Sequence, residues 1–350
     1  MPAPRPARIK DIAAKLGLSS MSVSVALRDM PGVSDETRTR VKNCAQKMGY
    51  QPDPAMSALA DYRRRQRPAS AYAQLAYITN YEKKEDAAWS FAEEYLIGAK
   101  ERGKEFGYEV VPFWLRENDM SQRQASSILF NRGIKGLLIA PMPEEYGCLD
   151  LTWKYFVSVA LGTSLVKPEL DQFSFDHHRA MQLTIGELRC RGYRRIGLAM
   201  LQQRSARLLH ESLDTFLGEH YRDPTLVKIK PLLPQYYNSE EFWQWFDKQK
   251  PDVIISDNAD DIRSLLKERK LRVPQDIGLT SYCRLPLHDQ TVSSYTQDLQ
   301  AIGAAAVDRL HTNLLRNLYG NQSKAISTLI RGTWKEGKTL RKRRSKRPPS

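Results

Sequence analysis

The first apolar residues of the chain recur every three or four positions. They are Ile9, Ile12, Ala13 and Leu16. This spacing predicts a short helix with one side facing a core. Gly17 follows directly, and a glycine in this place ends a helix. A second helix begins almost at once, with Ser19 as its N-cap and with an apolar face made of Val23, Ala26 and Leu27.

These two helices carry the residue types that a helix-turn-helix needs where its helices meet. Ala13 is small at the contact, Gly17 lies in the turn, and Val23 faces back to the first helix. A third helix follows, with Ser34 as its N-cap and two acids in its first turn. Its inward positions are Val41, Ala45 and Met48. The first fifty residues therefore predict an all-α head that presents its second helix to the major groove of DNA.

Residues 51–72 differ from the segments on either side. Asp53 suits a helix N-cap, Pro54 suits a first helical position, and the string AMSALA continues a helical pattern. A helix this short is unstable alone, so it needs a partner surface before it forms. We expect a hinge helix and a linker here.

From residue 74 onward, short strands alternate with amphipathic helices. Strands are expected at 74–80, 109–115, 135–142, 155–161, 194–201, 225–233, 251–257, 277–282 and 325–332. Helices are expected at 89–108, 121–133, 178–193, 207–220, 238–249, 260–270 and 300–320. Such alternation forms parallel sheets with helices on their faces. The predicted fold is therefore an all-α head followed by two α/β lobes with doubly wound parallel sheets.

The charges divide the chain into a neutral body with two basic ends. The net charge of the 350 residues is +14. Residues 1–70 hold 13 Lys and Arg against 6 Asp and Glu, and residues 335–350 hold 8 against Glu336 alone. Clustered cations favour a polyanion such as DNA. For the basic tail, residues 341–350, two interpretations stay open: a solvated end and a supporting role in DNA binding.

No catalytic or metal-ligating set is visible in the sequence. The four cysteines, Cys44, Cys148, Cys190 and Cys283, are far apart, and the adjacent His177 and His178 would point in different directions. The string GTWKEGKT at 332–339 matches the P-loop pattern, but only eleven residues follow it, too few for the helix that a phosphate cradle needs. We expect no enzyme activity, no cofactor and no metal.

No apolar run approaches the roughly 18 residues that a membrane span needs, and no apolar leader follows the N-terminal charges. We therefore expect no membrane partner, and a place in the bacterial cytoplasm with the nucleoid.

Several segments carry a family resemblance when they are taken in order. They are IKDIAAKLGLSSMSVSVALRDMPGVSDETRTRV, MGYQPDP with AMSALA after it, RGYRRIGLAM, LRVPQDIGLTSY and TVSSYTQD. Together they resemble the lactose/galactose repressor (LacI/GalR) family over almost the whole chain. The resemblance implies a dimeric regulator whose lobes are similar to periplasmic sugar-binding proteins and close around a small effector.

The expected domains follow from this organisation. They are a head at 1–50, a hinge and linker at 51–72, an N-terminal lobe at 73–163 with 291–322, a C-terminal lobe at 164–290 with 323–340, and a tail at 341–350.

The resemblance assigns DNA contacts position by position. The side chains that would face base edges are Ser20, Met21, Ser22 and Val25, and those that would hold phosphates are Ser19, Ser24, Ser34 and Thr37. Arg28 is grouped with these DNA-binding residues. Leu59 matches the hinge leucine that family members insert into the minor groove, with packing against its dimer mate as the alternative. Because Val25 replaces a basic or imidazole side chain of many relatives, the operator should differ.

The effector pocket departs further from the family pattern. The arginine that grips the ligand in sugar- and purine-binding relatives aligns with Leu209, next to Arg207, and the usual pocket acid is replaced by Cys283 and Arg284. Polar ligand contacts remain at Asp176 and Asp257, with helix capping as the alternative for both. The effector candidates are thus Asp176, Arg207, Asp257 and Arg284, for a ligand that is sugar-like or anionic.

The resulting hypothesis is a transcription regulator, most simply a repressor, that binds a roughly palindromic operator in double-stranded DNA as a homodimer. Two alternatives remain. One is a ligand-independent regulator with a degenerate pocket, and the other is a cytoplasmic solute-binding protein, which would leave the head without a role.

Overall fold

The computed structural model describes residues 7–27, 33–48, 50, 73–82, 89–285, 288–321 and 324–342. The head contains α1 (Ile9–Leu16), α2 (Ser20–Leu27) and α3 (Asp35–Lys47). Their buried side chains form one small core, made of Ile12, Ala13, Val23, Ala26, Val41, Cys44 and Ala45. The predicted hinge and linker, with Leu59, lie outside the described residues, as do Arg28 and tail residues 343–350.

The first lobe is built on a parallel six-stranded sheet in the order β12-β7-β5-β3-β1-β2. Its strands are β1 (Ala73–Thr79), β2 (Tyr108–Trp114), β3 (Gly136–Ile139), β5 (Val157–Leu161), β7 (Asp171–Phe175) and β12 (Ser327–Ile330). Successive residues of β1 face opposite sides: Leu75 and Tyr77 pack with α5 (Trp89–Glu105), whereas Ala76 and Ile78 pack with α6 (Gln122–Asn131). Helices therefore cover both faces of the sheet.

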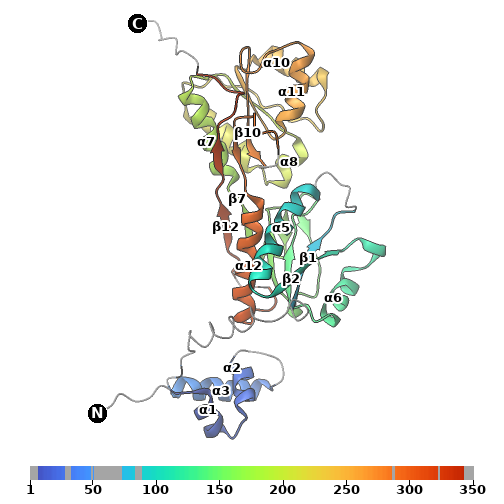
Figure 1. The fold of residues 1–350 in the computed structure, drawn as a ribbon, viewed down its shortest axis with the longest axis vertical. Helices are drawn as coiled ribbons and strands as arrows, with labels where there is room; N and C mark the ends of the chain where they lie inside the picture. Colours follow the sequence, from blue (N-terminus) through green and yellow to red (C-terminus); the bar gives the residue numbers. More distant parts are fainter. Residues whose placement is uncertain are drawn as a thin grey trace, which may run out of the picture.

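Helix α12 (Leu299–Leu315) packs tightly beside α5 (Figure 1). The contact depends on two glycines that face each other. A Cβ on Gly98 would lie 2.0 Å from the carbonyl oxygen of Gln300, and a Cβ on Gly303 would lie 2.1 Å from that of Tyr95. Two short 3-10 helices, Glu117–Asp119 and Trp153–Tyr155, and the small strand pair β4 (Gly147–Cys148) and β6 (Leu165–Lys167) complete this lobe.

The second lobe has a five-stranded sheet in the order β13-β11-β10-β9-β8, with only β13 antiparallel. Its strands are β8 (Ile196–Ala199), β9 (Val253–Ser256), β10 (Gly278–Arg284), β11 (Ser294–Thr296) and β13 (Thr333–Lys335). Its helices are α7 (His177–Cys190), α8 (Gln202–Arg207), α9 (Glu211–Arg222), α10 (Ser239–Gln249) and α11 (Ala259–Glu268). Strand residues again alternate between two apolar clusters, one packed on α7 and α9 and the other on α10 and α11. No helix in the described part of the chain is long and apolar enough to cross a membrane.

The boundaries of the lobes differ from those expected. Strands β7 and β12 belong to the first sheet, although they lie in ranges 164–290 and 323–340 that the sequence assigned to the second lobe. Strand β11 belongs to the second sheet, although it lies in range 291–322. The chain therefore crosses between lobes after β7, after β11 and after β12.

A buried carboxylate joins β7 to the other elements around it. Asp171 is 1% exposed and accepts hydrogen bonds from Arg309 Nε at 2.6 Å, Asn313 Nδ2 at 3.0 Å and the Ile326 N–H at 3.0 Å. The first two donors come from α12, and the third precedes β12. Burial alone would raise the pKa of Asp171, but these three donors lower it below its ordinary value.

Two predicted elements were wrong. The helix expected at 207–220 is interrupted, because Leu209 and His210 have positive φ angles of 49° and 60°. The strand expected at 225–233 is reduced to one bridge between Ala199 and Leu232. Pro231 and Pro234 flank that bridge, and proline has no N–H to donate to a ladder.

Candidate nucleic-acid interface and inter-lobe cleft

The turn between α1 and α2 has the geometry that the sequence predicted. Gly17 adopts a left-handed conformation with φ of 63°, and its N–H donates to the carbonyl oxygen of Ala13. The Leu18 N–H donates to the same oxygen at 3.0 Å. Because Ala13 and Val23 are both buried in the head core, the two helices meet closely at a fixed angle.

Helix α2 exposes one side and buries the other. Val23 and Ala26 are buried, whereas the Met21 side chain is 75% exposed. Ser19 and Ser20 are exposed at the beginning of the helix, and Ser22, Ser24 and Val25 are half-buried. A large apolar side chain so exposed on a small head gains nothing from the fold, so its position favours a role in contact with another molecule.

The beginnings of α2 and α3 are organised in the same way. Ser19 Oγ accepts from the Ser22 N–H at 2.9 Å and lies 2.8 Å from Ser22 Oγ. Ser34 Oγ accepts from the Thr37 N–H at 3.3 Å and lies 2.9 Å from Thr37 Oγ1. Both helix beginnings thus present hydroxyls beside the positive end of a helix dipole, which suits a phosphate group.

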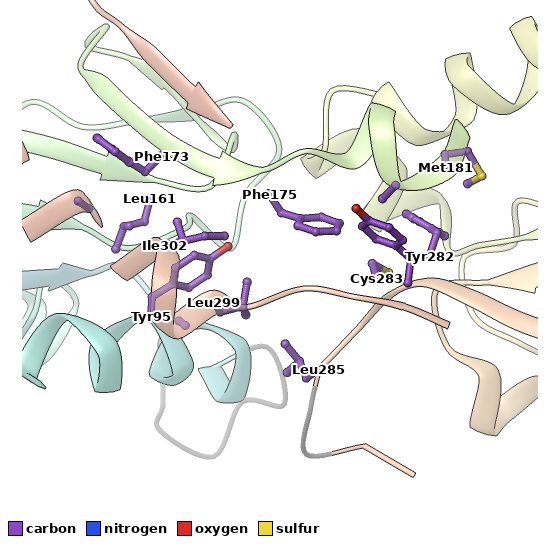
Figure 2. Packing of buried hydrophobic residues seen from close by; sticks show 14 of the residues in the cluster. Tyr95, Leu161, Phe173, Phe175, Met181, Tyr282, Cys283, Leu285, Leu299 and Ile302 are labelled. Carbon is purple, nitrogen blue, oxygen red and sulfur yellow. The ribbon is translucent and has the colours of Figure 1, made fainter. Parts of the chain in front are cut away.

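A continuous apolar core crosses from the first lobe into the second (Figure 2). Phe175, the last residue of β7, lies between Tyr95 and Leu299 of the first lobe and Tyr282 of the second. Its ring centroid lies 5.0 Å from that of His177 and 6.1 Å from that of Tyr295. The facing walls of the two lobes are therefore largely apolar at this level.

Two arginines of α8 reach from the second lobe to the first. Arg204 lies over the Phe91 ring at 5.0 Å, and Arg207 Nη2 donates to the Tyr81 hydroxyl at 3.1 Å. The Thr163 hydroxyl donates to the carbonyl oxygen of Arg207 at 3.3 Å. These contacts join the two lobes through groups of the chain itself.

Asp257 lies at the second-lobe end of this arrangement, with its side chain 1% exposed. It accepts from the Tyr237 hydroxyl at 2.6 Å and from the Leu201 N–H at 3.3 Å, and Arg204 Nε lies 3.9 Å away. Burial and the facing carboxylate hold the pKa of Tyr237 well above its ordinary value, so that its hydroxyl remains a donor. Arg204 Nη2 also donates to Cys283 Sγ at 3.6 Å.

Two family models match the chain. Residues 8–53 match the model of bacterial regulatory proteins of the lacI family, and residues 185–340 match that of a periplasmic binding protein-like domain. The chain therefore carries a lacI-family head in front of a periplasmic binding protein-like domain. The first match covers the helix-turn-helix described above, so the head is a DNA-binding domain of this family.

Similar proteins extend this likeness over most of the chain. The sucrose operon repressors of Escherichia coli and Shigella flexneri are each 24% identical over 303 residues, which is 80% of this chain and 84% of each relative. The lac repressor dimer bound to operator and the anti-inducer ONPF has a TM-score of 0.54 at 17% identity, over 96% of this chain and 99% of that one. The complex of the transcriptional regulator CelR with cellobiose has a TM-score of 0.58 at 14% identity, over 95% of this chain and 100% of that one. At these identities the solved structures show the fold.

The predicted effector residues do not converge on a free site in the two-lobed core. Asp176 caps α7 by accepting from the Arg179 N–H at 2.8 Å, as the capping alternative predicted. Asp257 caps no helix, since the N-cap of α11 is Asn258, and that alternative was wrong for it. Arg284 is 4% exposed and donates to Asp260 Oδ2 and to the Asp289 carbonyl oxygen, both at 3.3 Å.

The sequence analysis missed Arg204, which contacts groups of both lobes. Its partners Phe91, Asp257 and Cys283 come from three separate parts of the chain. The only signal within the sequence was a second arginine three residues before Arg207, which places both side chains on one face of a helix.

Proposed function

We propose that this lacI-family regulator represses transcription by binding, as a homodimer in the bacterial cytoplasm, to a roughly palindromic operator. The observation that carries the proposal is the exposed face of α2 with Met21 at its centre, on a head whose fold is fixed by its own core. One recognition helix reads too few base pairs for a unique site, so paired half-sites are needed, and these match a two-fold symmetric dimer. The relatives that are named operon repressors support the direction of regulation.

The test is selection of bound sites from a random DNA pool by the full chain, followed by binding to the recovered duplex at several salt concentrations. We expect two related half-sites in inverted orientation and an affinity that falls steeply as salt rises. A monomer on one asymmetric half-site, with an affinity that hardly changes with salt, would overturn the proposal.

In this proposal a small ligand in the inter-lobe cleft modulates operator binding. Similar solved structures contain cellobiose and, in a CcpA regulator from Weissella paramesenteroides, glucose or sucrose. A sugar-like effector is accordingly the first class to test, and an anion is the second because two arginines border the cleft.

A ligand-independent regulator is the second candidate, and one specific observation favours it. The groups expected to hold an effector bind groups of the chain itself: Asp257 accepts from Tyr237, Arg207 donates to Tyr81, and Arg284 donates to Asp260. Titration of the operator complex with sucrose, glucose, cellobiose and a sugar phosphate separates the two candidates. A change in operator affinity with any of them favours the effector-sensing regulator, and no change with all of them favours the ligand-independent one.

A further inference from the structure

All six strands of the first sheet begin at the same edge, because all of them are parallel. Strand β1 begins there with Ala73, directly after residues 51–72, which connect the sheet to the DNA-binding head. Helix α12 runs back toward this edge, since the Gly320 N–H, just after the helix, donates to the carbonyl oxygen of Phe156 at 2.9 Å. The surface here is therefore the part of the core at which the chain arrives from the head.

Basic and aromatic side chains gather at the middle of this edge. We define the amino-edge patch as Phe130, Arg132, Lys135, Lys154, Tyr155 and Arg316. The Phe130 and Tyr155 rings lie 4.7 Å apart, with 53% and 38% of these residues exposed, and they join the end of α6 to the second 3-10 helix. The Val157 N–H donates to the Lys135 carbonyl oxygen at 2.8 Å, which places Lys135 beside the same turn.

The four cations of the amino-edge patch are exposed, and none of them forms an ion pair with a carboxylate in the part of the chain that the structure describes. Arg132 and Lys154 instead lie over aromatic rings, at 5.9 Å from Phe113 and 5.1 Å from Tyr155. The same lobe neutralises Arg102 with Asp308 and Glu105. A ring that restricts such a side chain leaves its charge available and reduces the entropy that the side chain loses when it binds an external anion.

We propose that the amino-edge patch binds the phosphate backbone of the DNA beside the half-site that α2 reads. Lys135, Lys154 and Arg316 neutralise phosphates, while the Tyr155 hydroxyl adds a donor of the kind that contacts DNA backbones. DNA is favoured over a second copy of the chain because four of the six patch residues are cations without an ion pair in the described part of the chain, and because the patch adjoins the segment that leads to the DNA-binding head. The inference rests on the proposed function, since it requires that the head bind DNA.

The test compares two neutralising variants of the full chain with matched changes in charge. The first replaces Lys135, Lys154 and Arg316 by Gln, and the control replaces Lys228, Lys230 and Lys248, exposed lysines of the second lobe, by Gln. The probe is the duplex recovered by selection, with flanks of about 5 or about 25 base pairs. The connection of 22 residues spans at most roughly 75 Å, so the long flanks cover the DNA that the amino-edge patch can reach and the short flanks do not. Thermal unfolding of each variant shows whether the fold is retained.

On the long duplex we expect the patch variant to bind about tenfold more weakly than the parent at physiological salt, and the slope of log affinity against log salt to fall by about 2.7 per chain, or 0.9 per lost phosphate contact. The preferred half-site should be unchanged, and the loss should shrink on the short duplex. Equal losses for both variants, or an equal loss on both duplexes, would overturn the inference, because they would reveal only the net charge.

A shift of the patch variant toward monomers in analytical ultracentrifugation would also overturn the inference and assign the patch to an interface between copies. If the parent chain itself shows no half-site preference, the proposed function is contradicted. That result is distinct from the outcomes that overturn the inference about the amino-edge patch.

Discussion

His177 gives the most direct test of the packing between the lobes. It is 6% exposed, its ring lies between Phe175 and Tyr282, and its Nδ1 has no hydrogen-bond partner in the described part of the chain. Burial, assisted by the nearby Arg204 charge, lowers the pKa of His177 from 6.5 to about 3. The folded protein therefore keeps this imidazole neutral at pH values at which the unfolded chain protonates it.

The sign of the effect on stability follows from this difference. Below pH 6.5 the unfolded state binds a proton that the folded state does not, so acid favours unfolding. The His177 contribution is constant above pH 6.5 and is lost progressively as the pH falls toward 3. Well below pH 6.5 each pH unit lowers the free energy of unfolding by about 1.4 kcal/mol, and because the slope is half as steep at pH 6.5 itself, the loss between pH 6.5 and 4.5 is about 2.3 kcal/mol.

The assay is urea unfolding, followed by tryptophan fluorescence, at pH 7.5, 6.5, 5.5 and 4.5 for the parent and for His177→Gln. The quantity to compare is the difference between the two proteins at each pH, because burial lowers the pKa of His220 and of His288 as well, and those contributions cancel. We expect the variant to have a lower free energy of unfolding than the parent at pH 7.5. Below pH 6.5 the parent should lose about 1.4 kcal/mol per pH unit relative to the variant, so the difference between them should shrink. His178→Gln, an exposed position of the same helix, is the matched control. A difference between parent and His177→Gln that is the same at pH 7.5 and 4.5 would refute the assignment of a buried neutral imidazole.

The remaining predictions concern the head, the first lobe and the hinge. Met21→Ala or Ser22→Ala should change the preferred bases at a cost of about 1–3 kcal/mol per lost contact, whereas Lys42→Ala should leave the preference intact, as measured by repeating the random-pool selection with each variant. Asp171→Ala should lower the free energy of unfolding by about 3–5 kcal/mol in urea, because it leaves a half-buried arginine and two N–H donors without their acceptor; a loss under 1 kcal/mol would contradict the described network. Leu59→Ala should weaken operator binding and reduce DNA bending in a circular-permutation gel shift, since an apolar wedge bends the duplex. Unchanged bending and affinity would refute the hinge interpretation, although the helix-turn-helix prediction would survive.

The head was predictable from sequence because its determinants are local. Ser19 and Ser34 bond N–H groups three residues ahead, and Gly17 ends α1 in the left-handed conformation that only glycine adopts without strain. Each of these contacts is contained within a few residues, so residue type and spacing were enough to place them. The assignment of DNA contacts to the side chains of α2 stays a prediction until the operator is selected.

The lobe boundaries were not predictable in the same way, because the strands concerned are short and polar. Strand β7 reads DQFSF and strand β11 reads SYT, and neither has the apolar run that indicates a buried strand. Their place is decided by pairing with distant strands, β7 with β5 and β12, and β11 with β10 and β13. The break at Leu209 and His210 has a similar origin, since no Gly or Pro marks it and the His210 N–H turns back to the Ser205 carbonyl oxygen at 2.8 Å.

The contacts of Arg204 between the two lobes, which also join distant parts of the chain, have a consequence for regulation by an effector. Arg204 contacts Asp257 and Cys283 of its own lobe while it lies over Phe91 of the other, so one side chain links groups of both lobes. An effector that bound Asp257 would have to displace Arg204 and would thereby remove a contact between the lobes. A ligand shifts a conformational equilibrium only by its difference in affinity for the two states. An effector that displaced Arg204 would favour contact between the lobes only if it bound both lobes more strongly than Arg204 does, and otherwise it would favour their separation. An effector that occupied Asp257 would therefore compete with Arg204, a residue whose side chain also packs on the other lobe.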